Sequence, residues 1–332
     1  MKVTFSNADL SISSYYDKVS GKELLSGEGG RFLLFRENTV PKGGCAWVEG
    51  VHMDETDLHK AGTPLVKTPV QKNPLRQQFK YDLQYKDNVI HVTAKLDADS
   101  PILELEVMAD WRMAADGNGS PKLSFRTGLC AAPEYFLSDS QIGFVQRTPL
   151  SNHDRCSRNF FHAPGAGLTL MTDSKYGHRG YDNRMEVSLL RCSSRPDPYP
   201  EIGHRHFRIG IAATGSDLSQ LKEMGSRFAH RDLAYASNRA HKGTLPLADT
   251  LVKVDNAAVT AVKVAEDHNG LIVRLTSIHE ESRTVTVTFP NLAEAWLTDL
   301  AEQNHTQCQV CDSGIQLTME PDTVVTLRLI SK

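Results

Sequence analysis

The residues best suited to chemistry in this 332-residue chain lie between two apolar runs, in the segment DSKYGHRGYDN at 173–183. Aromatic and basic side chains follow one another there: Tyr176, His178, Arg179 and Tyr181. Aromatic faces stack on pyranose rings, and basic groups donate hydrogen bonds to sugar hydroxyls. The segment is therefore a candidate sugar-binding loop, although an ordinary polar turn over a sheet edge has the same composition.

A pair of carboxylates has the spacing of a glycosidase acid and nucleophile. Glu104 and Glu106 lie two residues apart in ILELEV, so on a strand both side chains leave the same face, roughly 7 Å apart. Leucine and valine occupy the alternate positions of that run. This alternation favours a simpler interpretation, in which the glutamates form the solvated back of a half-buried strand.

Histidines and cysteines offer possible metal ligands. His204 and His206 in GHRHF share a strand face, and His162 or His178 could add a third ligand for zinc. The pair of cysteines in CQVC at 308–311 has no second pair or histidine pair at the spacing of a zinc ribbon. Since both arrangements are common without metal, no metal site is predicted in this chain. The sequence also has no nucleophile-elbow pattern and no glycine-rich phosphate loop.

Charge and composition narrow the classes of partner. The chain has 40 acidic and 37 basic residues and a formal charge of −3, so it offers no surface that would neutralise nucleic-acid phosphates. The sequence contains no apolar run of the length of a membrane span, and the N-terminus lacks the apolar core of a signal peptide. Six sparse cysteines indicate reduced thiols and a cytoplasmic location. Nucleic acid and membranes are therefore not expected as partners, while self-association stays open.

The elements that must position these residues are mostly short strands. RTVTVTF and IQLTME each place three apolar residues on one face, and turn residues separate many such runs. SDLSQLKEMGSRFAHR predicts a helix over about 217–230, with Ser216 as its N-cap. The polar stretch after this helix suggests a linker. We expect an all-β chain with a large sandwich domain at 1–242 and a small C-terminal β-sandwich at 243–332.

At DSKYG the chain resembles the C-terminal β region of the α-mannosidases of glycoside hydrolase family 38, nearest the branch that contains the cytosolic enzymes. The family pattern is a strand, Asp-x-Lys-Tyr-Gly, a strand ending Leu-Leu-Arg, a Pro-Asp loop and Asp-x-Gly-x-His-x-Phe. Further similarity lies in DKVSGKELL, in the Ala46–Trp47 pair, in QIGFVQRT and in AVKVAEDHNGLIVRL. The matching positions are Asp173, Lys175, Tyr176, Gly177, Leu189, Leu190, Arg191, Pro196, Asp197, Glu201, Gly203 and Phe207. Two positions depart from the pattern, because Glu201 replaces its aspartate and Arg205 replaces its histidine.

The resemblance implies a large super-sandwich of the galactose-mutarotase type followed by the small β-sandwich. Family members are retaining, metal-dependent exo-α-mannosidases whose nucleophile and zinc ligands lie in an N-terminal barrel, which a helical bundle follows. No catalytic residue, metal ligand or cofactor is therefore expected in this chain, and zinc is expected in the missing catalytic domain. Whether the chain alone is an enzyme is left open.

By the same resemblance, the chain would pack on the barrel and bundle of the same polypeptide and help to line the mannose pocket. The residues implied in binding α-mannosides are Lys175, Tyr176, His178, Arg179, Asp197, Glu201 and Arg205. One alternative is a stand-alone carbohydrate-binding or mutarotase-like module, in which Glu104 or Glu106 would act with a histidine such as His91. Another is a structural domain that never contacts sugar. An exposed apolar patch would be expected only where the chain docks on a barrel.

Overall fold

A computed structural model of the chain describes residues 1–27, 29–38, 46–116, 118–230, 242–244, 249–312 and 314–332. The described residues form two compact units. The first, here the large domain, comprises Met1–Asp139, Val145–Asp217 and Met224–His230. The second, here the small domain, comprises Ser140–Phe144, Leu218–Glu223 and the described part of 231–332. The expected boundary between 242 and 243 stays a prediction.

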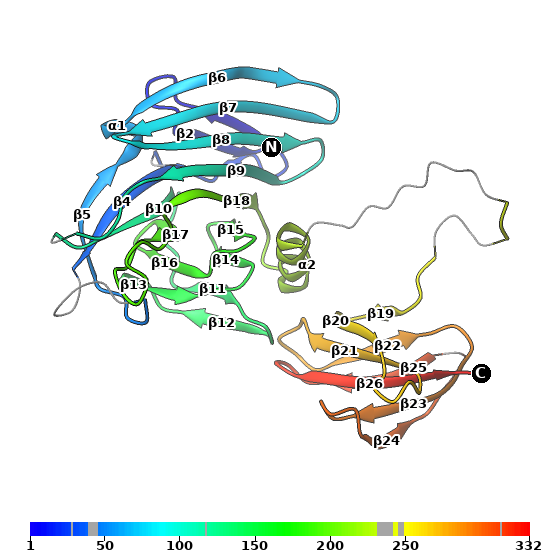
Figure 1. Cartoon of the computed structure of the whole chain (residues 1–332). Coiled ribbons are helices and arrows are strands. Elements are labelled where there is room, and N and C mark those ends of the chain that lie inside the picture. The colour runs from blue at the N-terminus through cyan, green and yellow to red at the C-terminus, as the bar shows by residue number, and fades with distance from the viewer. Residues whose placement is uncertain (28, 39–45, 117, 231–241, 245–248, 313) are drawn as a thin grey trace. The chain divides into compact units, whose positions relative to one another are not determined.

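Two antiparallel sheets form most of the large domain (Figure 1). The six-stranded sheet has the order β13 (Leu150–Cys156), β16 (Gly177–Tyr181), β17 (Arg184–Arg191), β10 (Ser120–Gly128), β4 (Arg31–Asn38) and β5 (Val51–Asp57). The nine-stranded sheet has the order β12 (Phe144–Arg147), β11 (Phe136–Asp139), β14 (Phe160–Ala163), β15 (Leu168–Thr172), β18 (Gly203–Ala213), β9 (Ile102–Trp111), β8 (Asn88–Asp97), β7 (Arg76–Tyr85) and β6 (Thr63–Lys72). A small sheet of β1 (Lys2–Phe5), β2 (Ile12–Asp17) and β3 (Lys22–Glu23) completes the domain.

One apolar core joins the two large sheets. In the six-stranded sheet, Phe125 and Val187 are fully buried, and in the nine-stranded sheet the same holds for Val107 and Phe207. In each of these strands, residues at every second position point into the core, because successive side chains of a strand leave opposite faces. The expected all-β fold with sandwiched sheets is confirmed.

The interpretation of ILELEV as a half-buried strand is also confirmed. Leu103 and Leu105 are buried on the core face of β9, and the side chains of Glu104 and Glu106 lie on its opposite, partly exposed face.

Two helices accompany the strands in the described part of the chain. Helix α2 spans Leu218–Ala229, close to the predicted 217–230. It lies beside β18, where Arg208 donates a hydrogen bond to the carbonyl of Phe228 (Figure 1). Helix α1, Leu58–Ala61, was not predicted, because four residues are too few to show a helical period. Asp57 caps it by accepting a hydrogen bond from the His59 amide. No helix among the described residues is long and apolar enough to cross a membrane.

The small domain has its own sandwich core. The three-stranded sheet contains β19 (Lys253–Asp255), β22 (Arg283–Thr288) and β25 (Gly314–Met319). The five-stranded sheet contains β20 (Ala257–Val264), β21 (Leu271–Ser277), β26 (Val324–Ser331), β23 (Leu292–Thr298) and β24 (Asn304–Cys308). Val285 and Val287 are fully buried, as the alternation in RTVTVTF predicts, and they share a core with Leu327 and Leu329 of the other sheet.

Candidate functional site

The loop that carries Lys175 and Tyr176 connects β15 to β16 and is fixed by hydrogen bonds of the Thr172 and Asp173 side chains. The Thr172 hydroxyl donates to the carbonyl of Lys175 at 2.6 Å. The carboxylate of Asp173 accepts from the backbone amide of Arg208 at 3.1 Å and from its guanidinium at 3.2 Å. These contacts tie the loop to β18 and so define where its side chains emerge.

Lys175, Glu201 and Arg205 come together in the structure. Burial lowers the pKa of Lys175, and the neighbouring Glu201 carboxylate opposes that shift while Arg205 adds to it. The ammonium of Lys175 lies 5.3 Å from the centre of the Phe207 ring. Arg205 and Glu201 form an ion pair at 3.2 Å, and Glu201 has a positive φ of 66°. A positive φ is rare outside glycine, so the local fold holds this residue in an uncommon conformation.

Tyr176 and Asp197 are exposed. More than half of the Tyr176 side chain is accessible, and its carbonyl accepts from the Ser157 amide at 2.9 Å. The Asp197 carboxylate accepts from the amide of Tyr199 at 2.9 Å, which closes a local turn. Both side chains are open to a ligand or to another part of a protein.

His178 and Arg179, in contrast, are buried inside the large domain. Burial lowers the pKa of His178 to about 4, and its ring lies 5.5 Å from that of Phe161. Arg179 pairs with Glu186 and lies 5.0 Å from the centre of the Phe35 ring. A sugar at the protein surface cannot reach either side chain in this structure, so any role of these two residues in binding is indirect.

A buried network of charged side chains surrounds Arg179, and sequence reasoning missed it. Strand β10 is buried along all nine residues, so both of its faces are covered. Leu123 and Phe125 face the apolar core, while Lys122 and Arg126 point to the other face. In the sequence, the alternation in PKLSFRTG indicates that the polar face of this strand is solvated. No local signal shows that β5 and β13 cover that face in the folded domain.

Lys122 is the centre of this network. Its side chain is fully buried, and its ammonium donates to Glu49 at 2.5 Å and to Asp154 at 2.8 Å. Glu37, also fully buried, lies 3.9 Å away. Burial disfavours the charged form of Glu49, but hydrogen bonds from His52 and Lys122 outweigh it and hold the pKa of Glu49 far below its usual range.

Arg126 extends the network toward the surface. It donates to both oxygens of Glu55 at 2.6 Å and to Glu186 at 2.5 Å. The Tyr181 hydroxyl donates to Glu186 at 2.8 Å, and burial together with that carboxylate raises the pKa of Tyr181. Tyr181, part of the candidate sugar loop in the sequence, therefore belongs to this network.

The residues of the network do not fit a metal ion. Among the described residues, Glu37, Glu49 and His52 have ligand atoms within 4.8 Å of one another. The Lys122 ammonium already occupies the space between them, 2.5 Å from Glu49 and 2.9 Å from the Nε2 atom of His52. A divalent cation there would meet a fixed positive charge at contact distance, so the group is complete as an ion network.

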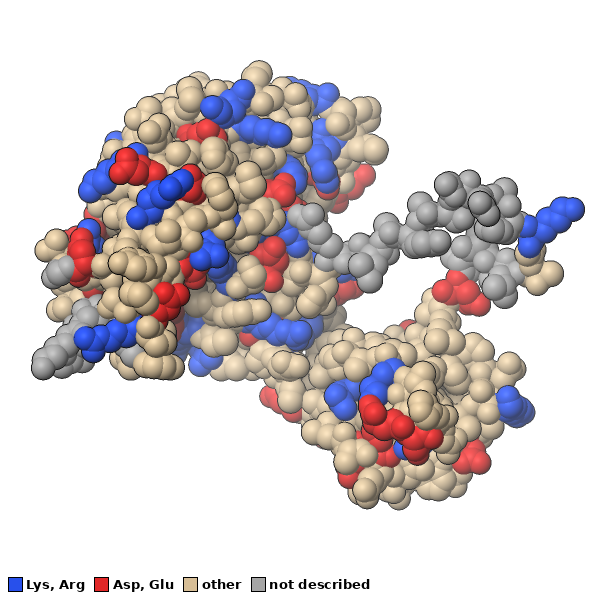
Figure 2. Space-filling model, viewed as in Figure 1, with Lys and Arg blue, Asp and Glu red and all other residues tan. Residues whose placement is uncertain are grey.

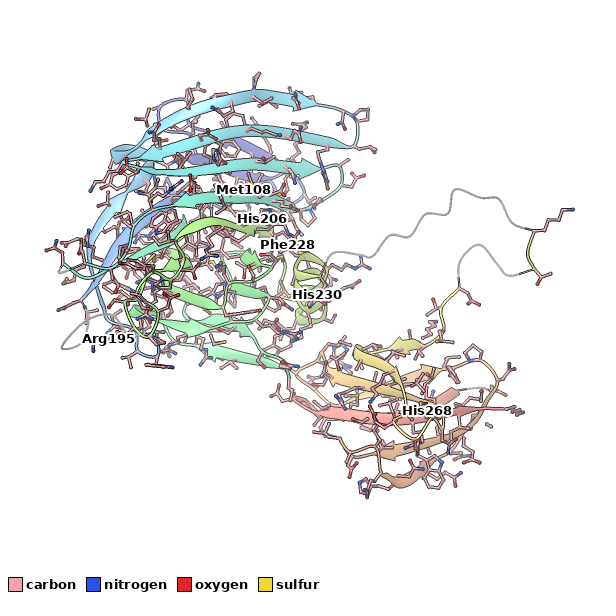
Figure 3. The ribbon with its side chains drawn as sticks, viewed as in Figure 1. Met108, Arg195, His206, Phe228, His230 and His268 are labelled. Carbon is pink, nitrogen blue, oxygen red and sulfur yellow. The ribbon has the colours of Figure 1, made fainter. Side chains whose placement is uncertain are left out.

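On the outer face of the nine-stranded sheet, the structure brings together Glu106 and His206. The Nε2 atom of His206 lies 3.2 Å from the Glu106 carboxylate, and Lys95 also pairs with that carboxylate. His206 and Met108 are direct neighbours across β18 and β9 (Figure 3). His91 pairs instead with Asp82 at 2.8 Å. If this face carries proton-transfer chemistry, Glu106 and His206 are the pair that can perform it.

Among the described residues, two of the surface hollows are lined by other residues than these. Figure 2 shows basic and acidic side chains interspersed over the visible face of the large domain. A cleft of about 940 Å³ lies in the large domain and is lined by parts of 17–24, 73–77, 96–101, 165–167 and 213–215. A hollow of about 320 Å³ in the small domain is lined mainly by polar residues of 266–269 and 301–304.

Solved structures share this fold along almost the whole chain. An α-mannosidase from Enterococcus faecalis V583 matches with a TM-score of 0.78 and 14% identity, over 98% of this chain and 41% of its own length. A second structure, a protein of glycosyl hydrolase family 38 from Enterococcus faecalis, matches with a TM-score of 0.77 and 14% identity, over 98% of this chain and 42% of its own. The chain thus spans about two fifths of the length of these proteins. No curated protein matches the sequence.

Two family models match the sequence itself. The model of the glycosyl hydrolases family 38 C-terminal domain matches residues 1–199, which is more than half of the chain. The model of the glycosyl hydrolases family 38 C-terminal beta sandwich domain matches residues 256–327, within the small domain. The chain therefore belongs to glycosyl hydrolase family 38 and corresponds to the C-terminal region of its members.

Proposed function

We propose that this chain is the C-terminal β portion of a retaining, metal-dependent exo-α-mannosidase, which packs on an N-terminal catalytic barrel and helps to line the mannose pocket. The observation that carries the proposal is the pair of family matches, together with a similar α-mannosidase that has 59% of its length outside the matched part. Retention requires two carboxyl groups about 5 Å apart around the anomeric carbon. In this proposal, those groups and the zinc ion lie in the barrel.

The residues of this chain would then bind and orient the sugar. We assign direct contact to the exposed or half-buried residues, namely Lys175, Tyr176, Asp197 and Glu201 in the two loops and Arg205 at the start of β18. Lys175 and Arg205 would donate hydrogen bonds to hydroxyls, and Tyr176 offers an exposed ring for stacking. His178 and Arg179 would contribute indirectly, because they hold β16 against β17 inside the large domain.

An exposed apolar segment supports docking over an independent sugar-binding module. Trp47, Val48, Val51 and Met53 are all at least 36% exposed, and they lie within seven residues of one another at an edge strand. Apolar side chains gathered in this way indicate a surface that is covered in the working protein.

A cytoplasmic location and membership of the cytosolic-type branch are part of the proposal. The five described cysteines are free thiols, as expected for a protein that works in a reducing compartment.

The proposal is tested by hydrolysis of an aryl α-mannoside, with zinc or cobalt present. The chain alone should give no turnover above a protein-free blank. Addition of the separately produced catalytic portion of the parent enzyme should give turnover. Variants Lys175→Ala and Arg205→Ala should then raise KM more than they lower kcat, since their contacts are to the bound sugar. A full rate from the catalytic portion alone would contradict the proposal.

A mutarotase-like activity is the second candidate, and it rests on the contact between Glu106 and His206. A carboxylate and an imidazole in contact could move protons to and from a sugar ring oxygen and hydroxyl. Faster equilibration of aldose anomers by the chain, abolished in Glu106→Gln, would favour this candidate.

A further inference from the structure

The segment at 47–53 presents apolar side chains to solvent, from a backbone that is held firmly. Trp47 is 77% exposed, and Val48 and Val51 are each more than half exposed. Single exposed apolar residues are common on protein surfaces, but a tryptophan with three apolar neighbours in one short segment is not. Strand β5 ends the hydrogen-bonded order of the six-stranded sheet among the described residues, and β13, at the other end of that order, contacts it.

Charged side chains anchor the backbone of this segment at several points. Arg191 donates to the carbonyl of Val48 at 2.5 Å, and the same guanidinium pairs with Glu37. Glu37 also accepts from the amide of Gly50 at 3.2 Å. A second loop contributes as well, because the carbonyl of Arg195 accepts from the Ala46 amide at 2.8 Å. The segment therefore needs little further ordering when it binds a partner.

The side chains of the segment divide by chemistry. Glu49 and His52 point inward, where both contact the Lys122 ammonium. On β5, the alternation of a strand places Val51 and Met53 on the face opposite to His52. The polar groups that a sugar would need beside an aromatic ring are thus engaged inside the domain, and apolar groups remain outside. This division fits a protein surface better than a carbohydrate.

We infer that the segment at 47–53, with Trp47 as its anchor, is the contact through which this chain docks on the remaining portion of its own enzyme. The inference rests on the proposed function and identifies the surface involved. A rigidly presented tryptophan is a frequent hot spot of protein interfaces, because it buries a large area at a small entropic cost. The similar α-mannosidase has more than half of its length available as the partner.

The test uses the chain and the catalytic portion of the parent enzyme as two polypeptides, with their Kd measured by biolayer interferometry. Trp47→Ala should weaken association at least about tenfold, and Val51→Ser should also weaken it. The matched control is Leu75→Ala, because Leu75 is equally exposed at 77% but lies in the turn between β6 and β7. This control should bind like the wild type. Equal melting temperatures of the wild type and the variants would show that the substitutions leave the fold intact.

The outcomes separate the inference from the proposed function. If the wild-type chain does not associate at all, the proposed function fails and the inference fails with it. If the wild type associates and Trp47→Ala associates equally well, only the inference is overturned. It is also overturned if the wild-type chain alone is a dimer that Trp47→Ala converts to a monomer, since a second copy then covers the segment. A Trp47→Ala variant that associates normally but raises KM for an aryl α-mannoside would assign the ring to sugar instead.

Discussion

Replacement of Lys122 by methionine removes one buried positive charge and keeps most of the packing of the side chain. The lysine stem lies in strand β10, and methionine fills nearly the same space. What disappears is the ammonium that contacts Glu49 at 2.5 Å and Asp154 at 2.8 Å. The substitution therefore tests whether the buried network needs its central charge.

The magnitude follows from the carboxylates left behind. Removal of one partner from a buried ion pair costs about 3–5 kcal/mol, because an uncompensated charge remains in the interior. The uncompensated charge is removed at the smallest free-energy cost when one carboxylate takes up a proton. At pH 7 that costs a carboxyl of ordinary pKa near 4.3 about 3.7 kcal/mol, and at pH 5 it costs only about 1 kcal/mol. We therefore expect Lys122→Met to lower the free energy of unfolding by about 3–4 kcal/mol at pH 7 and by clearly less at pH 5.

Urea titration, followed by tryptophan fluorescence, measures this loss. Both proteins would carry Trp296→Phe, so that the remaining tryptophans, Trp47 and Trp111, report on the large domain. Lys80→Met is the control, because Lys80 lies exposed on β7, and its change should stay within about 0.5 kcal/mol. A loss of stability below about 1 kcal/mol for Lys122→Met at pH 7, or a loss that grows toward pH 5, would show that the buried network does not need its central charge.

Three further predictions follow from single buried groups. Burial lowers the pKa of His178 to about 4, so the stability that neutral His178 contributes is complete above the ordinary pKa near 6.5 and falls between pH 6.5 and 4. In urea titrations, His178→Phe should therefore reduce the fall in unfolding free energy between pH 7 and pH 5 by about 2 kcal/mol. An unchanged fall would contradict this prediction. Burial raises the pKa of Cys192 to about 12, so iodoacetamide at pH 8 should label exposed Cys156 but not native Cys192 in peptide mass spectrometry, whereas equal labelling would disprove the burial. In Gly180→Ala, the new Cβ would lie 2.5 Å from the Phe136 ring, and the urea midpoint should fall by an amount equivalent to about 1–3 kcal/mol; an unshifted midpoint would show that the ring can move aside.

Sequence patterns predicted the parts of the fold that depend on local periodicity. The alternation in RTVTVTF and ILELEV identified the buried faces of β22 and β9, because burial of every second residue leaves a direct trace in a strand. The predicted helix near 217–230 was found for the same reason, since apolar residues at helical spacing mark one face. Helix α1 escaped notice because a single turn shows no period.

The candidate site was only partly accessible from the sequence. Lys175, Glu201 and Arg205 were singled out by residue type and resemblance, and the structure places them together. The burial of His178 and Arg179 could not be predicted, since it depends on strands that pair only in the folded sheet. The Lys122 network has the same origin, because its partners Glu49 and Asp154 lie 73 and 32 residues away.

We propose that this chain is one working portion of an α-mannosidase. The most direct test measures hydrolysis of an aryl α-mannoside by the chain, by the catalytic portion of its parent enzyme, and by an equimolar mixture of the two. No turnover is expected from this chain alone, and full turnover is expected only from the mixture. Turnover by this chain alone, at a rate above the protein-free blank and abolished in Glu106→Gln, would contradict the proposal.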